Sequence, residues 1–425
     1  QTCALPILES GATQSIGPWE PLPPRLSPVF QLDEDSVDAG FPRSSGQISC
    51  RLKSSARITP IAHMQDTRLL TLEMETGASW SPGDIVHLVP FNAAPLVDET
   101  LQLLHWDGEL RLVQASLDST WHDLALPIRV TELLRRYCDL SKIPSRTQIR
   151  RLATLVPAAR DSPVTEMHLE KLKEIATDED AYLDYVYRPK RSIVEVLADF
   201  QPTLQLPVER VFDIFSRIKP RMFSIANACS TNEVEVLTAM VDIDTKRGFK
   251  RAGVFTDWVR TQGIARDLDR AVISRGSLRL PAALETVILI ATGTGIAPLR
   301  AMLQHLHMNF DGRVRAYLFY GCRSMTADFY FQQDWEAMRP MLTVHAAGSR
   351  DRGDGRKVYI DDIMREHAGP FRERALEGLG IFVAGHSRLP RLVQGALRDI
   401  WGREEAEAKL AYLKRQHRFQ SETWS

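Results

Sequence analysis

The stretch Thr286-Val-Ile-Leu-Ile-Ala-Thr-Gly-Thr-Gly-Ile-Ala-Pro-Leu-Arg300 limits the possible folds more than any other part of the chain. Val287 to Ala291 is a short apolar run rich in β-branched residues, which predicts one buried strand. The run breaks at Gly293 and Gly295, and a helical pattern follows from Ala297 to His307. The free N–H groups and the positive dipole of such a helix start favour a pyrophosphate, although a lone G-x-G is equally typical of a plain tight turn.

Composition and charge narrow the class of protein. The 425 residues suffice for two or three domains, and a formal net charge of -1 gives no sign of a nucleic-acid or membrane partner. No apolar run approaches the ~20 residues that a membrane helix needs. The cysteines are odd in number and form no C-x-x-C pair, which predicts a reducing, cytoplasmic location and no metal site. They are Cys3, Cys50, Cys138, Cys229 and Cys322.

The order of patterns along the chain predicts a multidomain fold. A proline-rich start is followed by short alternating strands, a helical region, further strands, and then alternating strands and helices. We therefore expect an antiparallel β-barrel with a helical insert, followed by a doubly wound α/β domain with a parallel sheet. The expected boundaries are a disordered linker at 1–47, barrel segments at 48–91 and 211–279 around an insert at 92–210, and the α/β domain at 280–425.

A second motif is Arg221-Met-Phe-Ser-Ile-Ala226. The plain interpretation is an edge strand with an exposed arginine. The functional interpretation uses the two-residue period of a strand, which places Arg221 and Phe223 on one face. The guanidinium could then bind a phosphate while the ring lies against a flat heterocycle and Ser224 reaches its edge.

Three further segments have the chemistry of phosphate sites. Gly253-Val-Phe-Thr-Asp-Trp-Val259 places a glycine before a Thr or Asp N-cap, so the helix that opens there could hold a pyrophosphate. Taken alone, the segment is better explained by ordinary helix capping with Trp258 in the core. Ala347-Gly-Ser-Arg350 and Lys357-Val-Tyr-Ile-Asp361 bring a hydroxyl, a guanidinium and an ammonium group after a sheet strand. These groups suit a phosphate monoester, and a solvated charged loop is the alternative.

Together these motifs resemble the ferredoxin–NADP reductase superfamily, especially its cytochrome P450 reductase-like branch. The segment Ile61 to Arg68, the phenylalanine of R-M-F-S and the ending Phe419-Gln-Ser-Glu-Thr-Trp424 are similar to the NADPH-dependent diflavin oxidoreductases of cytosolic iron–sulfur protein assembly. The resemblance covers roughly residues 48 to 425. Those proteins begin with a flavodoxin-like FMN domain that is not present in this sequence.

The resemblance implies FAD and NADPH as cofactors, with FMN only if the N-terminal domain exists in the full product. It implies catalytic roles for Ser224, Glu422 and Trp424, the last as an aromatic shield over the flavin. The implied FAD-binding residues are Lys190, Arg221, Met222, Phe223, Ser224, Gly253, Val254, Phe255, Thr256 and Trp424. The implied NADP-binding residues are Gly293, Thr294, Gly295, Arg323, Ser349, Arg350, Lys357, Val358, Tyr359, Ile360 and Asp361.

The resemblance also implies a route for the electrons, from NADPH through FAD to an FMN domain and on to an anamorsin-type iron–sulfur protein. A stand-alone FAD reductase that serves a separate flavodoxin or ferredoxin is one alternative, and a catalytically silent binding module is another. Several residues depart from the reductase pattern. They include Ala384 in place of cysteine, His386 in place of an acid, Leu392 in place of an acid, Leu299 in place of phenylalanine, and Lys190 with Arg191 in place of a paired arginine. Their effect on hydride transfer is left open.

Overall fold

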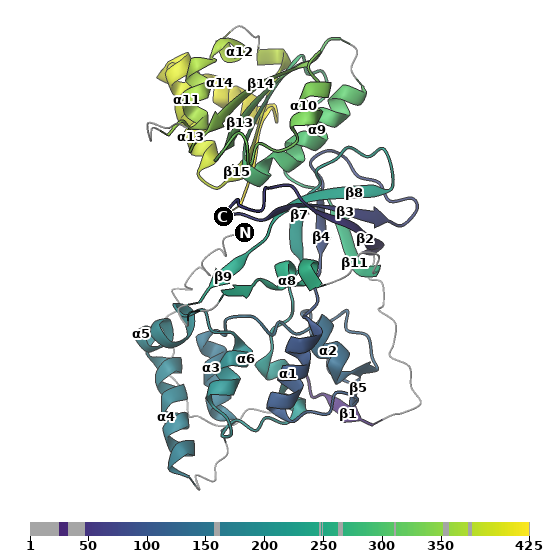
Figure 1. Ribbon diagram of the computed structural model, residues 1–425, viewed down its shortest axis with the longest axis vertical. Coiled ribbons are helices and arrows are strands. Elements are labelled where there is room, and N and C mark those ends of the chain that lie inside the picture. The colour runs from purple at the N-terminus through teal and green to yellow at the C-terminus, as the bar shows by residue number, and fades with distance from the viewer. Residues whose placement is uncertain are drawn as a thin grey trace.

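A computed structural model describes residues 25–32, 47–156, 162–245, 248, 250–261, 267–309, 312–351, 357–372 and 376–424. Three tiers are stacked along the long axis of the molecule (Figure 1). A helical tier lies at one end, a β-barrel in the middle and an α/β domain at the other end. The predicted fold class is confirmed, and the exact domain boundaries remain predictions.

The barrel is a six-stranded antiparallel sheet with the order β7-β4-β11-β2-β3-β8. Its strands are β2 (Gln47–Arg57), β3 (Thr67–Met74), β4 (Ile85–Leu88), β7 (Arg221–Ser224), β8 (Glu233–Ala239) and β11 (Asp267–Ser274). A bridge between Ile225 and Val236 brings the two outer strands together, and the Ala226 N–H donates to the Glu235 carbonyl at 2.7 Å. The sheet therefore closes on a core that includes Leu70 and Leu72, both fully buried.

Helix α8 (Val254–Thr261) packs on this barrel, next to the two-stranded sheet of β9 (Asp242–Asp244) and β10 (Lys250–Ala252). Trp258 and Phe255 of α8 lie in the barrel core cluster. The start of α8 is thereby held at one edge of the barrel.

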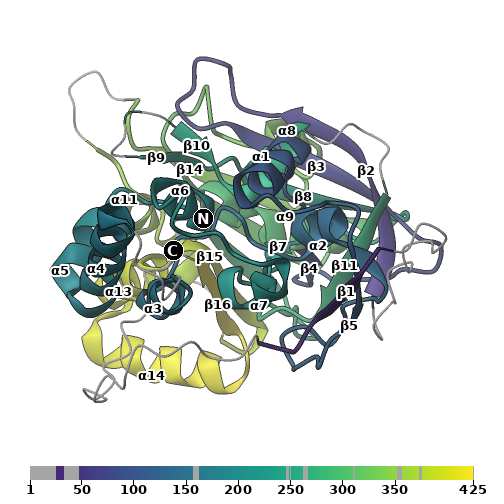
Figure 2. The same cartoon turned by 90° about the horizontal axis from the view of Figure 1, so that it is seen from below.

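The helical tier is inserted in the chain between β4 and β7 of the barrel. Figure 2 shows the molecule from below, on the side of this tier. Its helices are α1 (Ala94–Leu104), α2 (Val130–Arg136), α3 (Arg146–Thr154), α4 (Pro163–Thr177), α5 (Glu179–Tyr182), α6 (Ile193–Asp199) and α7 (Val211–Ile214), with a π-helical turn at Leu183–Tyr187. Ser192, a candidate N-cap by its place at the start of a helical sequence pattern, does cap α6. Its hydroxyl accepts the Glu195 N–H at 3.1 Å, and the Glu195 carboxylate accepts the Ser192 N–H at 2.6 Å. The insert has an apolar core of its own.

The predicted linker at 1–47 needs a correction at residues 29–31. Strand β1 (Val29–Gln31) pairs antiparallel with β5 (Arg111–Gln114), which in turn pairs with β6 (Ile128–Arg129). Val29-Phe-Gln31 has too short a pattern to predict a strand alone, and its partner lies about eighty residues further along the chain. Residues 1–24 and 33–46 of the predicted linker lie outside the described residues.

The α/β domain has a five-stranded sheet with the order β14-β13-β12-β15-β16, and every neighbouring pair is parallel. The strands are β12 (Thr286–Thr292), β13 (Arg315–Cys322), β14 (Leu342–Gly348), β15 (Leu379–His386) and β16 (Phe419–Trp424). The helices are α9 (Ile296–Met308), α10 (Gln332–Ala337), α11 (Ile360–Glu366), α12 (Gly369–Arg372), α13 (Leu389–Trp401) and α14 (Arg403–Arg415). The predicted doubly wound sheet is confirmed.

The continuous apolar run of β12 is explained by burial on both faces of this sheet. Val287 and Leu289 lie in the core on the α9 side, whereas Ile288 and Ile290 lie in the core with residues of α11 and α13. A central parallel strand has no solvent face, so alternation is lost. Among the helices of the described residues, none combines the length and the apolar character needed to cross a bilayer.

Candidate functional site

The glycine turn after β12 is pressed against the sheet on one side and open on the other. A Cβ on Gly295 would lie 2.2 Å from the Ala384 carbonyl oxygen, so the close approach requires glycine. Gly293 has a φ of +54° and nothing within 4 Å of where its Cβ would point. The Tyr320 hydroxyl donates to the Gly293 carbonyl at 3.1 Å and fixes the turn. The open side, with Thr294 between the glycines and α9 behind it, fits a dinucleotide pyrophosphate.

The residues predicted for the 2′-phosphate lie at the ends of two neighbouring strands. The Ser349 N–H donates to the Cys322 carbonyl at 3.0 Å, and the Arg350 N–H donates to the Arg323 carbonyl at 2.8 Å. These backbone bonds bring Arg323, Ser349 and Arg350 together beyond β13 and β14. Lys357 is exposed, and Arg352 to Arg356 lie outside the described residues.

The segment Lys357 to Asp361 leads into α11. Tyr359 is 50% exposed and, like Lys357, available to a nucleotide. Ile360 is buried in the core, and the Asp361 carboxylate binds Arg365 at 2.9 Å. Side-chain contacts of Ile360 and Asp361 with a nucleotide are therefore not favoured, and the roles of Val358, Ile360 and Asp361 remain predictions.

Strand β7 carries the R-M-F-S motif along the edge of the barrel. The Arg221 guanidinium is partly exposed and donates to the Lys219 carbonyl at 2.6 Å. Phe223 is only 8% exposed, because it packs in the barrel core with its ring centroid 4.7 Å from that of Phe255. Met222 is the exposed member of the strand, with 60% of its surface accessible. The contact of Phe223 with a flavin ring therefore remains a prediction.

The start of α8 corrects one detail of the predicted pyrophosphate site. The helix begins at Val254, so Gly253 precedes it and Thr256 lies inside its first turn. The buried Thr256 hydroxyl accepts the Val241 N–H at 2.7 Å, so Thr256 is not the N-cap. The N–H groups of Val254 and Phe255 lie in the first turn, where no intrahelical acceptor exists, and they suit a phosphate.

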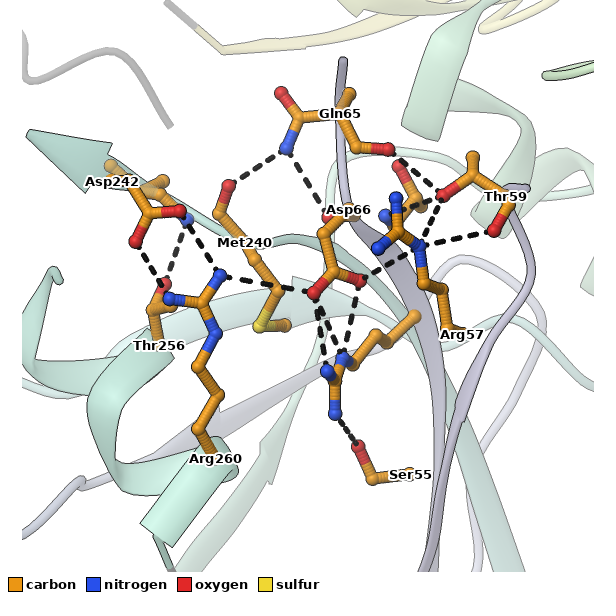
Figure 3. A network of polar contacts seen from close by, with 12 residues as sticks. Ser55, Arg57, Thr59, Gln65, Asp66, Met240, Asp242, Thr256 and Arg260 are labelled. Carbon is orange, nitrogen blue, oxygen red and sulfur yellow. Dashed lines mark hydrogen bonds and ion pairs between the residues drawn. The ribbon is translucent and has the colours of Figure 1, made fainter. Parts of the chain in front are cut away.

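An arginine cluster around Asp66 holds the other end of α8 (Figure 3). Asp66 forms ion pairs with Arg68 at 3.2 Å, Arg57 at 3.7 Å and Arg260 at 3.8 Å. Arg260, at the end of α8, also binds Asp242 at 2.7 Å, and this pair holds the pKa of the Asp242 carboxyl below its usual value. The cluster links β2, β3 and β9 to α8 and thus fixes the direction of the helix.

Lys190 lies where the insert meets the barrel. Its backbone is left-handed, with a φ of +56°, and its side chain is exposed. The Lys190 carbonyl accepts a hydrogen bond from Arg251 at 2.6 Å, and Arg251 also binds Glu195 at 2.6 Å. Since Arg251 is two residues before Gly253, this contact places Lys190 beside the start of α8. No sequence motif predicted the Arg251 contact.

The C-terminal strand meets β7 at a carboxylate that two hydroxyl groups bind. The Ser224 hydroxyl donates to Oε1 of Glu422, and the Ser277 hydroxyl donates to Oε2 at 3.0 Å. Ser224 and Glu422 are 198 residues apart in the sequence. The structure therefore brings together two of the three residues predicted to be catalytic. Ser277 had no motif to single it out.

Strand β16 is held in place by contacts with the segment between the two domains. Gln420 binds the Arg279 backbone twice, accepting from its N–H and donating to its carbonyl, both at 2.7 Å. The Arg279 guanidinium donates to Asp84 of the barrel at 2.7 Å. Trp424 lies on the same face of β16 as Glu422, by the two-residue period of a strand, and its carbonyl accepts the Ser387 N–H at 3.1 Å.

Three of the residues that depart from the reductase pattern lie on or after β15. In register, Ala384 pairs with Glu422 and His386 pairs with Trp424. Ala384 is fully buried and provides the carbonyl that Gly295 approaches, whereas Leu392 is 48% exposed on α13. Ala384 and His386 therefore border the place where the nucleotide turn and the C-terminal strand meet.

A buried acid of the insert lies in the electrostatic field of Arg221. Burial raises the pKa of Asp139, although Arg221 and Lys142 act in the opposite direction. Burial likewise lowers the pKa of Lys142, and its ammonium group donates to Ser216 at 2.9 Å. The described residues contain no group of three or more His, Cys, Asp or Glu side chains that could hold a metal ion.

Comparison with known proteins agrees with this geometry. A family model described as an FAD binding domain matches residues 47–258, and one described as an oxidoreductase NAD-binding domain matches residues 289–395. The NADPH-dependent diflavin oxidoreductase 1 of Xenopus laevis is 33% identical over 395 residues, which are 88% of this chain and 64% of that protein. The Mus musculus protein of the same name is 31% identical over 396 residues, with the same coverage. That of Schizosaccharomyces pombe is 27% identical over 446 residues, which are 99% of this chain and 74% of that protein.

The chain thus spans 64% of the length of the first two relatives. The two matched stretches fall on the barrel with its insert and on the parallel-sheet domain, and they contain the start of α8 and the glycine turn before α9. The chain belongs to the oxidoreductases that combine an FAD-binding with an NAD-binding domain, and it is a homologue of the NADPH-dependent diflavin oxidoreductases over that part of their length.

Proposed function

We propose that this chain transfers a hydride from NADPH to FAD. The observation that carries the proposal is the contact of Ser224 with Glu422, because it joins the flavin strand β7 to the end of the nucleotide-binding sheet. When bound, FAD accepts the hydride and can pass its two electrons on singly. The residues of the chain bind the two cofactors, align their rings and exclude water.

Phosphate contacts supply the binding energy at both ends of the site. Arg221 and the start of α8 are suited to the FAD pyrophosphate, and the glycine turn before α9 is suited to that of the nicotinamide nucleotide. Lys190 lies beside the start of α8 and adds a positive charge there. With each cofactor held at its phosphates, the reactive rings meet near Ser224.

Ser224, Glu422 and Trp424 have distinct roles in this proposal. Ser224 hydrogen-bonds the reacting edge of the flavin, and Glu422 orients the Ser224 hydroxyl and stabilises positive charge nearby. Trp424 follows on the same strand face and covers the flavin ring until the nicotinamide displaces it. Ser277 holds the second oxygen of Glu422 and so keeps the carboxylate from rotating.

NADPH is favoured over NADH by the groups beyond β13 and β14. Ser349, Arg350 and the exposed Lys357 provide a hydroxyl, a guanidinium and an ammonium group for a doubly charged 2′-phosphate. Arg323 adds a second guanidinium to the same place. A ribose without this 2′-phosphate would offer no negative charge to the positively charged side chains of Arg323, Arg350 and Lys357.

Further transfer would follow the pattern of the relatives, whose name states that they are diflavin enzymes. Electrons would pass from FAD to an FMN domain, in the same chain of a longer product or in a separate one, and on to an iron–sulfur assembly protein in the cytoplasm. A stand-alone FAD reductase of a flavodoxin or ferredoxin is the second candidate. The helical insert weighs against that candidate, since by resemblance it is the element that joins an FMN domain to the barrel.

The spectrum and electron-acceptor preference of the purified chain test the proposal. We expect a yellow protein that reduces ferricyanide with NADPH but hardly reduces cytochrome c, because the latter needs the FMN domain. Addition of a separately purified flavodoxin-like domain should restore cytochrome c reduction. A colourless chain that fails to take up added FAD would contradict the proposal and favour a binding module.

A further inference from the structure

Arg300 is a charged residue buried at the junction of the two cofactor-binding domains. It lies on α9, five residues after Gly295 of the nucleotide turn, and is only 7% exposed. A fully charged side chain is rarely buried unless it is paired. The contacts of Arg300 therefore indicate which parts of the molecule this residue holds together.

The guanidinium of Arg300 binds both domains at once. Towards the barrel, Nη1 donates to the Ala226 carbonyl at 3.0 Å and to the Glu235 carboxylate. Towards its own domain, Nε donates to the Asp334 carboxylate at 2.6 Å, and the guanidinium lies 4.2 Å from the centroid of the Phe331 ring. Ala226 is two residues after Ser224, so the Arg300 side chain joins the segment that follows β7 to helix α9.

The planar fork of the guanidinium explains why arginine is needed here. It presents donors in fixed directions to a carbonyl and two carboxylates while its face stacks on a ring. A lysine could neutralise one carboxylate but could not hold this geometry. Since Glu235 and Asp334 belong to different domains, the fork also fixes the angle between α9 and β8.

Two other contacts lie at the same junction. The Gln304 side chain, one helical turn after Arg300, accepts the Ala228 N–H at 2.9 Å. The Tyr330 hydroxyl donates to the Thr67 hydroxyl of β3 at 3.0 Å, and burial raises the pKa of Tyr330 to about 12, so the hydroxyl stays a donor. These two hydrogen bonds also connect the domains beside Arg300. Each of them joins only one pair of uncharged groups, whereas Arg300 binds several groups at once.

We propose that Arg300 is a positioning residue for hydride transfer, which locks the nucleotide-binding domain onto the FAD barrel. The inference rests on the proposed transfer from NADPH to FAD and names the residue that sets its geometry. A displacement of about 1 Å between reacting rings lowers a rate by up to about 100-fold, whereas binding through phosphates is little changed. Loss of the Arg300 contacts therefore reduces the rate of FAD reduction without an equal loss of nucleotide affinity.

Conservative variants separate this role from a merely structural one. Arg300→Lys keeps the charge and loses the fork, and Glu235→Gln weakens the bond between the domains while leaving Arg300 in place. Asp334→Asn weakens only a contact within the nucleotide domain and serves as the matched comparison. Arg398→Lys alters an exposed ion pair between Arg398 of α13 and Glu407 of α14, and it is the control far from the junction.

Two measurements are made on each FAD-loaded variant. Anaerobic stopped-flow mixing with NADPH gives the rate of FAD reduction, and calorimetric titration gives the affinity for adenosine 2′,5′-bisphosphate. We expect the reduction rate to fall roughly 10- to 100-fold in Arg300→Lys and Glu235→Gln, and the affinity to change less than about twofold. Asp334→Asn is expected to show a smaller loss of rate than Glu235→Gln. Rates in both junction variants within about twofold of the Arg398→Lys control would overturn the inference.

A third measurement, differential scanning calorimetry without nucleotide, reports the junction independently of activity. We expect the wild-type domains to unfold in one transition and those of Glu235→Gln to begin to separate into two, because the weakened junction couples them less strongly. One unchanged transition in both Arg300→Lys and Glu235→Gln would count against the lock. If wild-type protein binds both cofactors but transfers no hydride, the proposed function fails, and calorimetry alone then decides whether Arg300 joins the domains.

Discussion

Replacement of Gly295 by alanine is the sharpest perturbation of the nucleotide turn. The added Cβ would lie 2.2 Å from the Ala384 carbonyl oxygen, 2.5 Å from its carbonyl carbon and 2.7 Å from the Gly385 Cα. All three are backbone atoms of a central parallel strand, so they have little room to yield. Ordinary contact begins near 3.4 Å, so the turn must move by about 1.2 Å, the difference between 3.4 and 2.2 Å.

We expect this movement to weaken nucleotide binding selectively. Overpacking of this kind costs about 1–3 kcal/mol, which corresponds to roughly 5- to 150-fold in affinity if it falls entirely on binding. FAD content should be unchanged, because Arg221 and α8 lie in the other domain. Calorimetric titration with adenosine 2′,5′-bisphosphate measures the affinity, and the absorbance spectrum measures bound FAD.

Gly395→Ala is the matched control for the same chemical change. Gly395 lies in α13 with nothing within 4 Å of its added Cβ, so alanine should stabilise the helix by about 0.5–1 kcal/mol and leave binding unaltered. Nucleotide affinity in Gly295→Ala equal to that of Gly395→Ala would refute the assignment of the turn as the pyrophosphate site.

The remaining predictions concern the C-terminal strand and the far edge of the sheet. Glu422→Gln should retain FAD but slow its reduction by about tenfold, since a neutral amide holds the two serines less strongly; an unchanged stopped-flow rate would contradict this role. Trp424→Ala should lower the ratio of kcat/KM for NADPH over that for NADH, and an unchanged ratio would argue against the shield. Burial and the nearby His367 lower the pKa of His345 in the folded chain. As the pH falls below about 6.5, the unfolded chain therefore binds a proton at His345 more readily than the folded chain does, and the stability of the fold decreases. In His345→Gln the drop in Tm between about pH 7.5 and about pH 5.5 should be smaller than in wild type, and an equal drop would contradict the assignment.

The sequence predicted those parts of the fold that depend on local pattern. The run Val287 to Ala291 is uniformly apolar because both faces of β12 are buried, and the glycine break after it has few structural solutions. The alternation in Thr67 to Met74 likewise follows one inward face of the barrel. The cap at Ser192 is equally local, since it needs only Glu195 three residues later.

The parts that were missed depend on contacts between distant segments. Strand β1 exists because Val29 to Gln31 meets β5, and no pattern within three residues could reveal that partner. Thr256 and Asp257 were both candidates for the N-cap, but the helix begins at Val254 and the Thr256 hydroxyl accepts the Val241 N–H instead. Arg251 and Ser277 have no motif around them, and only the folded chain places them against Lys190 and Glu422.

For the same reason, the sequence predicted some residues of the candidate site and missed others. The family resemblance implied catalytic roles for Ser224 and Glu422 without predicting that they touch, and the structure joins them by a hydrogen bond. Phe223 was expected on a flavin face, but its packing against Phe255 shows how strongly the barrel core competes for an aromatic ring. A role in the junction was not predicted for Arg300, because the residue looks like an ordinary member of the helix after the turn.

The most direct test of the central claim is a single-turnover measurement of flavin reduction. The purified chain, loaded with FAD and freed of oxygen, is mixed with one equivalent of NADPH while the visible flavin band is followed. The geometry of Ser224, Glu422 and the glycine turn predicts rapid bleaching with NADPH. The proposed 2′-phosphate site at Ser349, Arg350 and Lys357 predicts much slower bleaching with NADH at the same concentration. A band that persists with both nucleotides, in a chain that binds FAD and adenosine 2′,5′-bisphosphate, would contradict hydride transfer as the function of this site.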